Sequence, residues 1–155
     1  MFNKLEDKGQ YSVKYITSGG YPTYFVRDEQ IAKNMMGVAS VRGDAIAIID
    51  HEYDTSRSLN YKDSNSIYYA VNNTFKSEAD ATYAAMFTPY GKYTLTRIAL
   101  PVEKDEDKKP ILPASFGYLK SLATAIKTSP NWLAMAGVSR GQVSGYTPID
   151  GDPII

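Results

Sequence analysis

The chain contains no cysteine and a single histidine among its 155 residues. Without thiols it cannot form a disulfide framework, a thiolate metal site or a cysteine nucleophile. His51 is therefore the one imidazole available as a general acid or base, and no Gly-x-Ser-x-Gly elbow supplies a nucleophile for it. The glycine patterns that cradle phosphates are missing as well. We expect no catalytic residue and no cofactor.

An excess of charge is also missing, because 17 lysines and arginines balance 17 aspartates and glutamates. Nucleic acid binding requires a basic face, so we expect no nucleic acid partner. A net charge near zero instead favours self-association. The sequence has no run of about 18 apolar residues that would span a membrane, and its first ten residues lack the apolar core of an export signal. We therefore expect a protein that folds in the cytoplasm and has no membrane partner.

Strand-like and helix-like segments alternate along the chain. Period-two patterns and apolar runs mark the strands, and apolar residues at helical spacing mark the helices. In chain order we expect a strand at 11–16, a helix at 28–43, a strand at 45–49, a helix at 66–75, strands at 82–87 and 93–100, a helix at 113–127 and an extended segment at 132–143. The apolar run 45–49 lies between aspartates and is typical of a central strand covered on both faces. This alternation predicts an α/β fold with three layers, a mainly parallel or mixed sheet with helices on both faces.

The length favours a single domain. We expect an N-terminal lead-in at 1–10, one domain at 11–143 and an irregular C-terminal tail at 144–155, which is rich in glycine and proline. The expected core residues are the apolar side chains on the inward faces of the strands and helices, namely Ile46, Ile48, Met86, Leu119, Leu122, Ile126 and Trp132. Pro130 forces a turn, so we expect the Trp132 indole to pack between the helix 113–127 and the sheet.

Carboxylates follow the apolar strand 45–49. Ligand sites in open α/β sheets lie beyond the carboxyl ends of strands, and the oxygens of Asp50, Glu52 and Asp54 suit a hard cation such as Mg²⁺. The favoured alternative is that Asp50 ends the strand while the other two are solvated, with His51 hydrogen-bonded locally. A small metal- or ligand-binding α/β domain therefore stays open as a second hypothesis.

Tyrosine is abundant, with 13 copies. Its ring offers a large contact area with few rotatable bonds and a polar tip, which enriches it at protein interfaces. Tyr90 and Tyr146 fall in segments that read as irregular, and we treat them as candidates for contacts between subunits. For any single tyrosine, packing at the edge of the core is the simpler explanation.

Three ordered segments resemble the tail sheath proteins of contractile phages. The first is Arg42-Gly43-Asp44 followed by the apolar strand to Asp50, which is similar to the family's Arg-x-Asp strand. The second, from Tyr83 to Tyr90, reads YAAMFTPY and is similar to its Tyr-Ala-Ala-x-Tyr-x-Pro-Trp strand. The third comprises Pro113-Ala114-Ser115, Trp132 and the run from Ala134 to Gly141. The ordered set is more specific than any of its members.

The resemblance implies a structural subunit that polymerises with other copies around a tail-tube protein and drives contraction. It implies assembly in the host cytoplasm into a virion tail or a prophage-encoded tail, and it makes Arg140 and Gly141 candidates for a subunit contact. The related sheath of a secretion or bacteriocin-like machine fits the same resemblance. Sheath proteins continue well beyond the Arg-Gly pair and exchange strands through terminal arms. This chain stops soon after Gly141, so we expect a fragment or reduced relative that is monomeric in isolation.

Overall fold

The structure is a computed structural model that describes residues 4–24, 28–53, 66–76, 78–88, 90–94, 108–128 and 142–149. The chain divides into two compact units, Met1–Phe87 and Thr88–Ile155. The first unit contains a parallel sheet and the second an antiparallel sheet, and both contain helix. The expected α/β class is confirmed. The sequence suggests one domain over 11–143, whereas the boundary between the two units falls inside that range.

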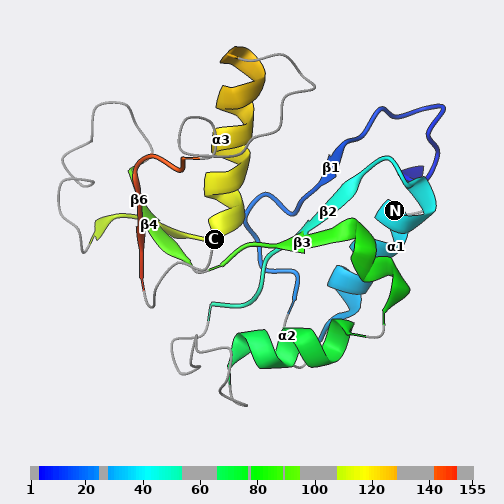
Figure 1. Ribbon diagram of the computed structural model, residues 1–155, viewed down its shortest axis with the longest axis horizontal. Helices are drawn as coiled ribbons and strands as arrows, with labels where there is room; N and C mark the ends of the chain where they lie inside the picture. Colours follow the sequence, from blue (N-terminus) through cyan, green and yellow to red (C-terminus); the bar gives the residue numbers. More distant parts are fainter. Residues whose placement is uncertain are drawn as a thin grey trace. The chain divides into compact units, whose positions relative to one another are not determined.

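The first unit is built on three parallel strands, β1 (Tyr15–Ile16), β2 (Ile46–Ile49) and β3 (Ala84–Met86) (Figure 1). Their order is β1-β2-β3, so β2 is the central strand, as its continuous apolar sequence predicts. The register places Ile16 opposite Ala47 and Ile49 opposite Met86.

Two helices and a short 3₁₀ helix connect these strands: α1 (Gln30–Arg42), α2 (Ile67–Phe75) and η2 (Ala79–Tyr83). Helix α1 ends at Gly43, whose φ of 64° is the left-handed conformation that favours glycine. Helix α2 begins after Ser66, whose hydroxyl accepts a hydrogen bond from Tyr69 N at 3.1 Å. Both ends agree with the expected helix ranges 28–43 and 66–75. At the other end of α1 the expected range starts at Asp28, whereas the helix starts at Gln30, after Glu29. The Asp28 carboxylate accepts a hydrogen bond from Gln30 N at 3.1 Å.

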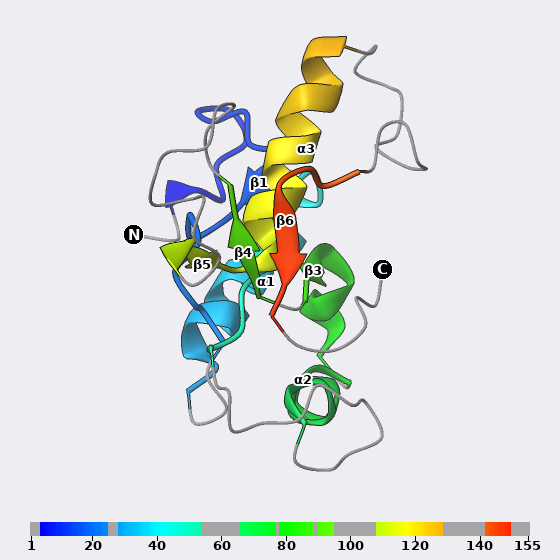
Figure 2. The same cartoon turned by 90° about the vertical axis from the view of Figure 1, so that its left-hand side faces the viewer.

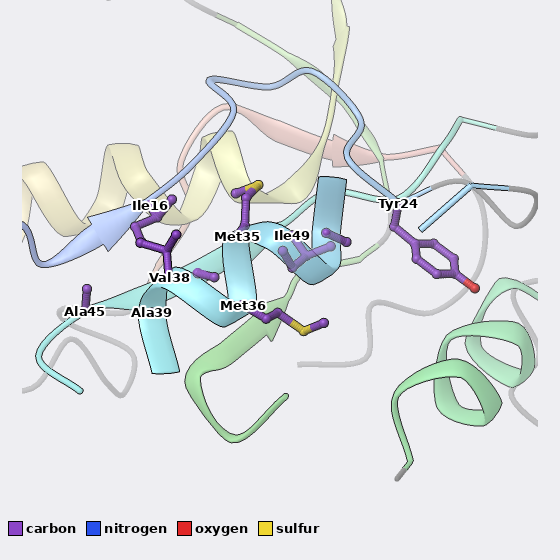
Figure 3. Close-up of a cluster of buried hydrophobic side chains, with 10 residues drawn as sticks. Ile16, Tyr24, Met35, Met36, Val38, Ala39, Ala45 and Ile49 are labelled. Carbon is purple, nitrogen blue, oxygen red and sulfur yellow. The ribbon is translucent and has the colours of Figure 1, made fainter. Parts of the chain in front are cut away.

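The core of the first unit lies between α1 and one face of the sheet. Figure 3 shows side chains of α1 next to Ile16 and Ile49 of the strands. The buried members of this cluster are Ile16, Tyr24, Ala32, Met35, Met36, Val38, Ala39, Ala45, Ala47 and Ile49. Residues of α2 and η2 pack against the same cluster, so the helical segments of this unit gather on one face. Parallel strands in sequential order carry their connecting helices on one face when the crossovers share one hand, as crossovers generally do. Helices on both faces are not found among the described residues of this unit.

The second face of β2 is covered unevenly. Ile48 is completely buried, as expected for a core residue, but Ile46 on the same face is 45% exposed. The expectation that Ile46 lies in the core is wrong, because its neighbour Tyr15 belongs to a strand of only two residues and is itself half-buried. Met86 of β3 is half-buried and packs against the core cluster.

The second unit is built on three antiparallel strands, β4 (Gly91–Tyr93), β5 (Ile111–Leu112) and β6 (Tyr146–Pro148), in the order β5-β4-β6. Helix α3 (Ala114–Thr128) runs behind β4 and β6 in Figure 2. The expectation of an irregular tail from residue 144 is wrong at 146–148, which pair with β4. Pro148 is compatible with this strand because β6 lies at the edge of the sheet, where a missing N–H donor is tolerated.

Helix α3 and β4 meet through a tyrosine and a glycine. The Tyr93 hydroxyl accepts from Gly117 N at 3.2 Å and lies 3.2 Å from the Pro113 carbonyl oxygen, to which it donates. A Cβ on Gly117 would come within 2.8 Å of the Tyr93 hydroxyl and 2.6 Å of Val143. Glycine therefore allows the helix to approach the strand closely.

The expected apolar face of α3 is only partly buried. The buried residues of this helix are small, namely Ser115, Gly117 and Ser121, while Leu119 and Leu122 are half-buried. Ile126 is 53% exposed, so the expectation that it belongs to the core is wrong. Close contact at small residues, rather than the row of large apolar side chains, determines which face of this helix is buried. Trp132 lies outside the described residues.

Candidate functional site

Backbone pairing occupies the end of β2, where the sequence places its candidate site. The carbonyl oxygen of Asp50 accepts from Thr23 N at 2.8 Å and from Tyr24 N at 3.0 Å. Glu52 N in turn donates to Tyr24 O at 2.9 Å, and a parallel bridge joins Tyr24 to His51. The segment at 23–24 therefore continues the sheet alongside the end of β2.

The side chain of Thr23 reinforces this pairing. Its hydroxyl oxygen lies 3.3 Å from Asp50 N, from which it accepts, and 3.4 Å from Asp50 O, to which it donates. Thr23, Tyr24, Asp50 and His51 are all at most 5% exposed. A buried backbone group without a hydrogen-bond partner lowers the stability of the fold. The Thr23 hydroxyl hydrogen-bonds to both the N–H and the carbonyl group of Asp50. The end of the strand is thus a closed structural junction.

His51 is held in one tautomer inside this junction. Its Nδ1 lies 2.7 Å from the carbonyl oxygen of Glu52. A carbonyl oxygen only accepts, so Nδ1 carries the proton and the lone pair is on Nε2. Burial lowers the pKa of His51 below its usual 6.5, although the hydrogen bond to Glu52 opposes this effect. At neutral pH the ring is therefore uncharged, and at 5% exposure it offers little surface to a substrate in solution.

The carboxylates proposed to hold a metal ion differ in how deeply they are buried. Asp50 is completely buried, Glu52 is half-buried, and Asp54 lies outside the described residues. Within the described ranges, no group of three or more acidic or histidine side chains is placed to hold a metal ion. The metal hypothesis therefore gains no support from this part of the chain.

The tyrosines proposed for subunit contacts are buried or half-buried. Tyr90 is 8% exposed, which leaves little of its ring for a neighbouring subunit. Tyr146 is half-buried, and its ring centroid lies 5.0 Å from that of Tyr93. The ring of Tyr146 also covers Gly91 so closely that a Cβ there would lie 1.8 Å from it. Arg140 and Gly141 lie outside the described residues.

The structure gives Arg42 a role that the sequence argument missed. Its side chain is completely buried, and Nε donates to Asp44 Oδ1 at 2.9 Å. Nη1 donates to Leu5 O at 2.7 Å, and Nη2 donates to Tyr11 O at 2.9 Å and to Asp44 Oδ2 at 3.2 Å. A sequence signal did exist, because Arg-x-Asp at the junction of a helix and a buried strand suits a local guanidinium–carboxylate pair. The two carbonyl partners are too distant in sequence to infer.

No protein-family model, curated protein or solved structure matches this chain. Over the part of the chain that the structure describes, none of the helices combines the length and the apolar character needed to cross a membrane.

Proposed function

We propose that this chain is a structural domain of a contractile tail sheath and has no enzymatic role. The observation that supports this best is the pairing of two of the sheath-like segments. Segment 42–50 supplies β2 and segment 83–90 supplies β3, and these strands are parallel neighbours with Ala47 opposite Ala84. Two segments that pair in one sheet constrain each other, which gives a physical reason for their occurrence as an ordered set.

The contacts of the motif residues support a structural role over a chemical one. Arg42 and Asp44 bind each other at 2.9 Å, and Arg42 holds two backbone carbonyls. At the end of β2, Asp50 and His51 are enclosed by backbone pairing with the segment at 23–24. Asp50 and His51 are at most 5% exposed, and the more exposed Asp44 carboxylate is engaged by the Arg42 guanidinium. A catalytic centre requires a positioned group that a substrate can reach.

The proposed partners are other copies of the sheath protein and the tail-tube protein, and the proposed location is a virion or prophage-encoded tail. A sheath of a secretion or bacteriocin-like machine would use the same domain and is the alternative within this class. The ligand-binding hypothesis remains separate and makes a different prediction. Specific binding of Mg²⁺, Ca²⁺ or Mn²⁺ would raise the melting temperature of the chain by linkage, whereas a structural domain shows no specific shift.

Immunogold labelling of tail particles tests the proposal. Antibodies raised against the purified chain are applied to particles induced from the source organism and viewed by negative-stain electron microscopy. We expect gold along the whole tail wall in extended tails, and on the shortened outer cylinder but not on the exposed inner tube after contraction. Antibody pre-absorbed with the chain is the matched control. Label confined to the capsid, to the baseplate or to the soluble fraction would overturn the proposal.

A further inference from the structure

The first residues of the described chain are fastened to the fold by one buried guanidinium. We call residues 4–14 the N-terminal strap. Arg42 donates to the strap at Leu5 O (2.7 Å) and at Tyr11 O (2.9 Å), and its own side chain is 0% exposed. Between these two carbonyls the strap makes a turn at Asp7. The Asp7 carboxylate accepts from Gly9 N at 2.8 Å, and the Asp7 backbone carbonyl accepts from Tyr11 N at 3.3 Å.

The strap is held at several points although most of its residues are exposed. The strap residues at 7–12 are exposed, but Leu5 and Val13 at its two ends pack against the core cluster of the first unit. If the strap is removed, two donors of a buried, charged guanidinium lose their partners. A buried charged donor without a partner costs more than a neutral one. Asp44 is 38% exposed and satisfies only part of the guanidinium.

The topology of the sheet sets the direction in which a pulling force on the strap acts. The strap enters β1 at the amino end of a parallel sheet, and the chain leaves β3 at the carboxyl end, near Phe87. Tension between residue 4 and residue 88 therefore runs along the strands and shears their hydrogen bonds together, instead of opening them one after another. Arg42 lies at the end of α1, two residues before Asp44 and four residues before Ile46, where β2 begins, so it joins the strap to the centre of this sheet.

We propose that Arg42 is a mechanical clamp that transfers tension from the N-terminal strap to α1 and the central strand β2. The first contact that meets the load is Leu5 O, the second is Tyr11 O, and the β1–β2 ladder follows. The clamp is a property of the fold and does not depend on the proposed function, although a subunit that moves under load in an assembly would make use of it.

Force spectroscopy on the full chain tests the clamp. The chain has no cysteine, so Lys4→Cys with Thr88→Cys supplies two unique thiol handles. We expect the strap to stay attached until the first unit unfolds as a whole. In Arg42→Lys, which keeps the charge but loses the guanidinium fork, we expect the strap to detach first, at a rate about tenfold or more above wild type at the same force.

A second pulling geometry is the matched control. With handles at Lys14→Cys and Thr88→Cys, the load bypasses both strap carbonyls, and Arg42→Lys should then change the unfolding force much less. Equal fractional losses in both geometries would show only a general loss of stability and would overturn the clamp. The force–extension curve of the wild-type chain tests the clamp even if Arg42→Lys does not fold. Early release of the strap in wild type, as a low-force extension step of up to about 35 Å, would also overturn it.

Discussion

Replacement of Gly91 by alanine tests the packing of the second unit most directly. The new Cβ would lie 1.8 Å from Cε2, 2.3 Å from Cδ2 and 2.8 Å from Cζ of the Tyr146 ring. Gly91 does not have a positive φ, so the backbone accepts alanine and the effect comes from the clash alone. The Tyr146 ring would have to move, which would disturb its contact with Tyr93. Overpacking costs about 1–3 kcal/mol and the lost ring pair about 0.5–1.5 kcal/mol.

We therefore expect Gly91→Ala to lower the free energy of unfolding by about 1.5–4.5 kcal/mol, the sum of these two contributions, measured by urea titration with circular dichroism. Gly37→Ala in α1 is the matched control, because a Cβ there meets only Asp80 Oδ2 at 3.8 Å. This change at a half-buried helix position with room for a Cβ should stabilise by about 0.5–1 kcal/mol, since alanine favours helix. In a Tyr146→Ala background, Gly91→Ala should cost less than about 0.5 kcal/mol. Equal costs with and without the Tyr146 ring would refute the reasoning.

Substitutions at three further positions probe other contacts. The folded-state pKa of His51 lies below 6.5, so as the pH falls the unfolded chain binds a proton at this residue before the folded chain does. The contribution of neutral His51 to stability should therefore be fully present above about pH 6.5 and should decrease as the pH is lowered toward the folded-state pKa. His51→Gln should flatten this part of a melting-temperature profile measured from pH 7.5 to 5, and an unchanged profile would contradict a buried neutral ring. Tyr93→Phe removes the hydroxyl between Pro113 and Gly117 and should cost about 1–3 kcal/mol in urea titration; no measurable loss would mean that the hydroxyl is dispensable. Ser66→Ala removes the cap of α2 and should cost about 0.5–2 kcal/mol, whereas Ser66→Gly should cost only a few tenths.

In the first unit, the sequence predicts those elements whose positions depend on interactions between residues close in sequence. Gly43 and Ser66 mark helix ends because a left-handed glycine and a capping hydroxyl act within one turn. The run 45–49 predicted the central strand because a continuous apolar sequence needs cover on both faces. Such signals do not depend on the rest of the chain.

Features that depend on distant partners were missed. Arg42 is buried because of carbonyls 37 and 31 residues away, and no local pattern contains that information. The segment 144–155 around the strand at 146–148 contains two glycines and two prolines, which predict an irregular tail, and only β4 shows that 146–148 pair. The apolar side chain of Ile126 predicts a core position, although the contact face of α3 is made by small residues.

The candidate site shows the same division. The sequence correctly located Asp50 and His51 at the end of a central strand, because an acidic residue directly after an apolar run ends it. It did not predict that Thr23 and Tyr24, 27 residues earlier, would enclose that end through the Asp50 carbonyl. Burial by that segment, rather than residue type, makes the junction structural.

The strand order β5-β4-β6 has a consequence for synthesis on the ribosome. Strand β4 gains its first partner when Ile111–Leu112 emerges, but its second partner, Tyr146–Pro148, follows only after the whole of α3. While the emerged part of a nascent chain ends between residues 112 and 146, β4 therefore has one unpaired edge, which another chain can occupy. The three described strands of the first unit, in contrast, are all available once Met86 has emerged. A pause in translation within that window is therefore the stage at which wrong pairing between nascent chains is most favoured.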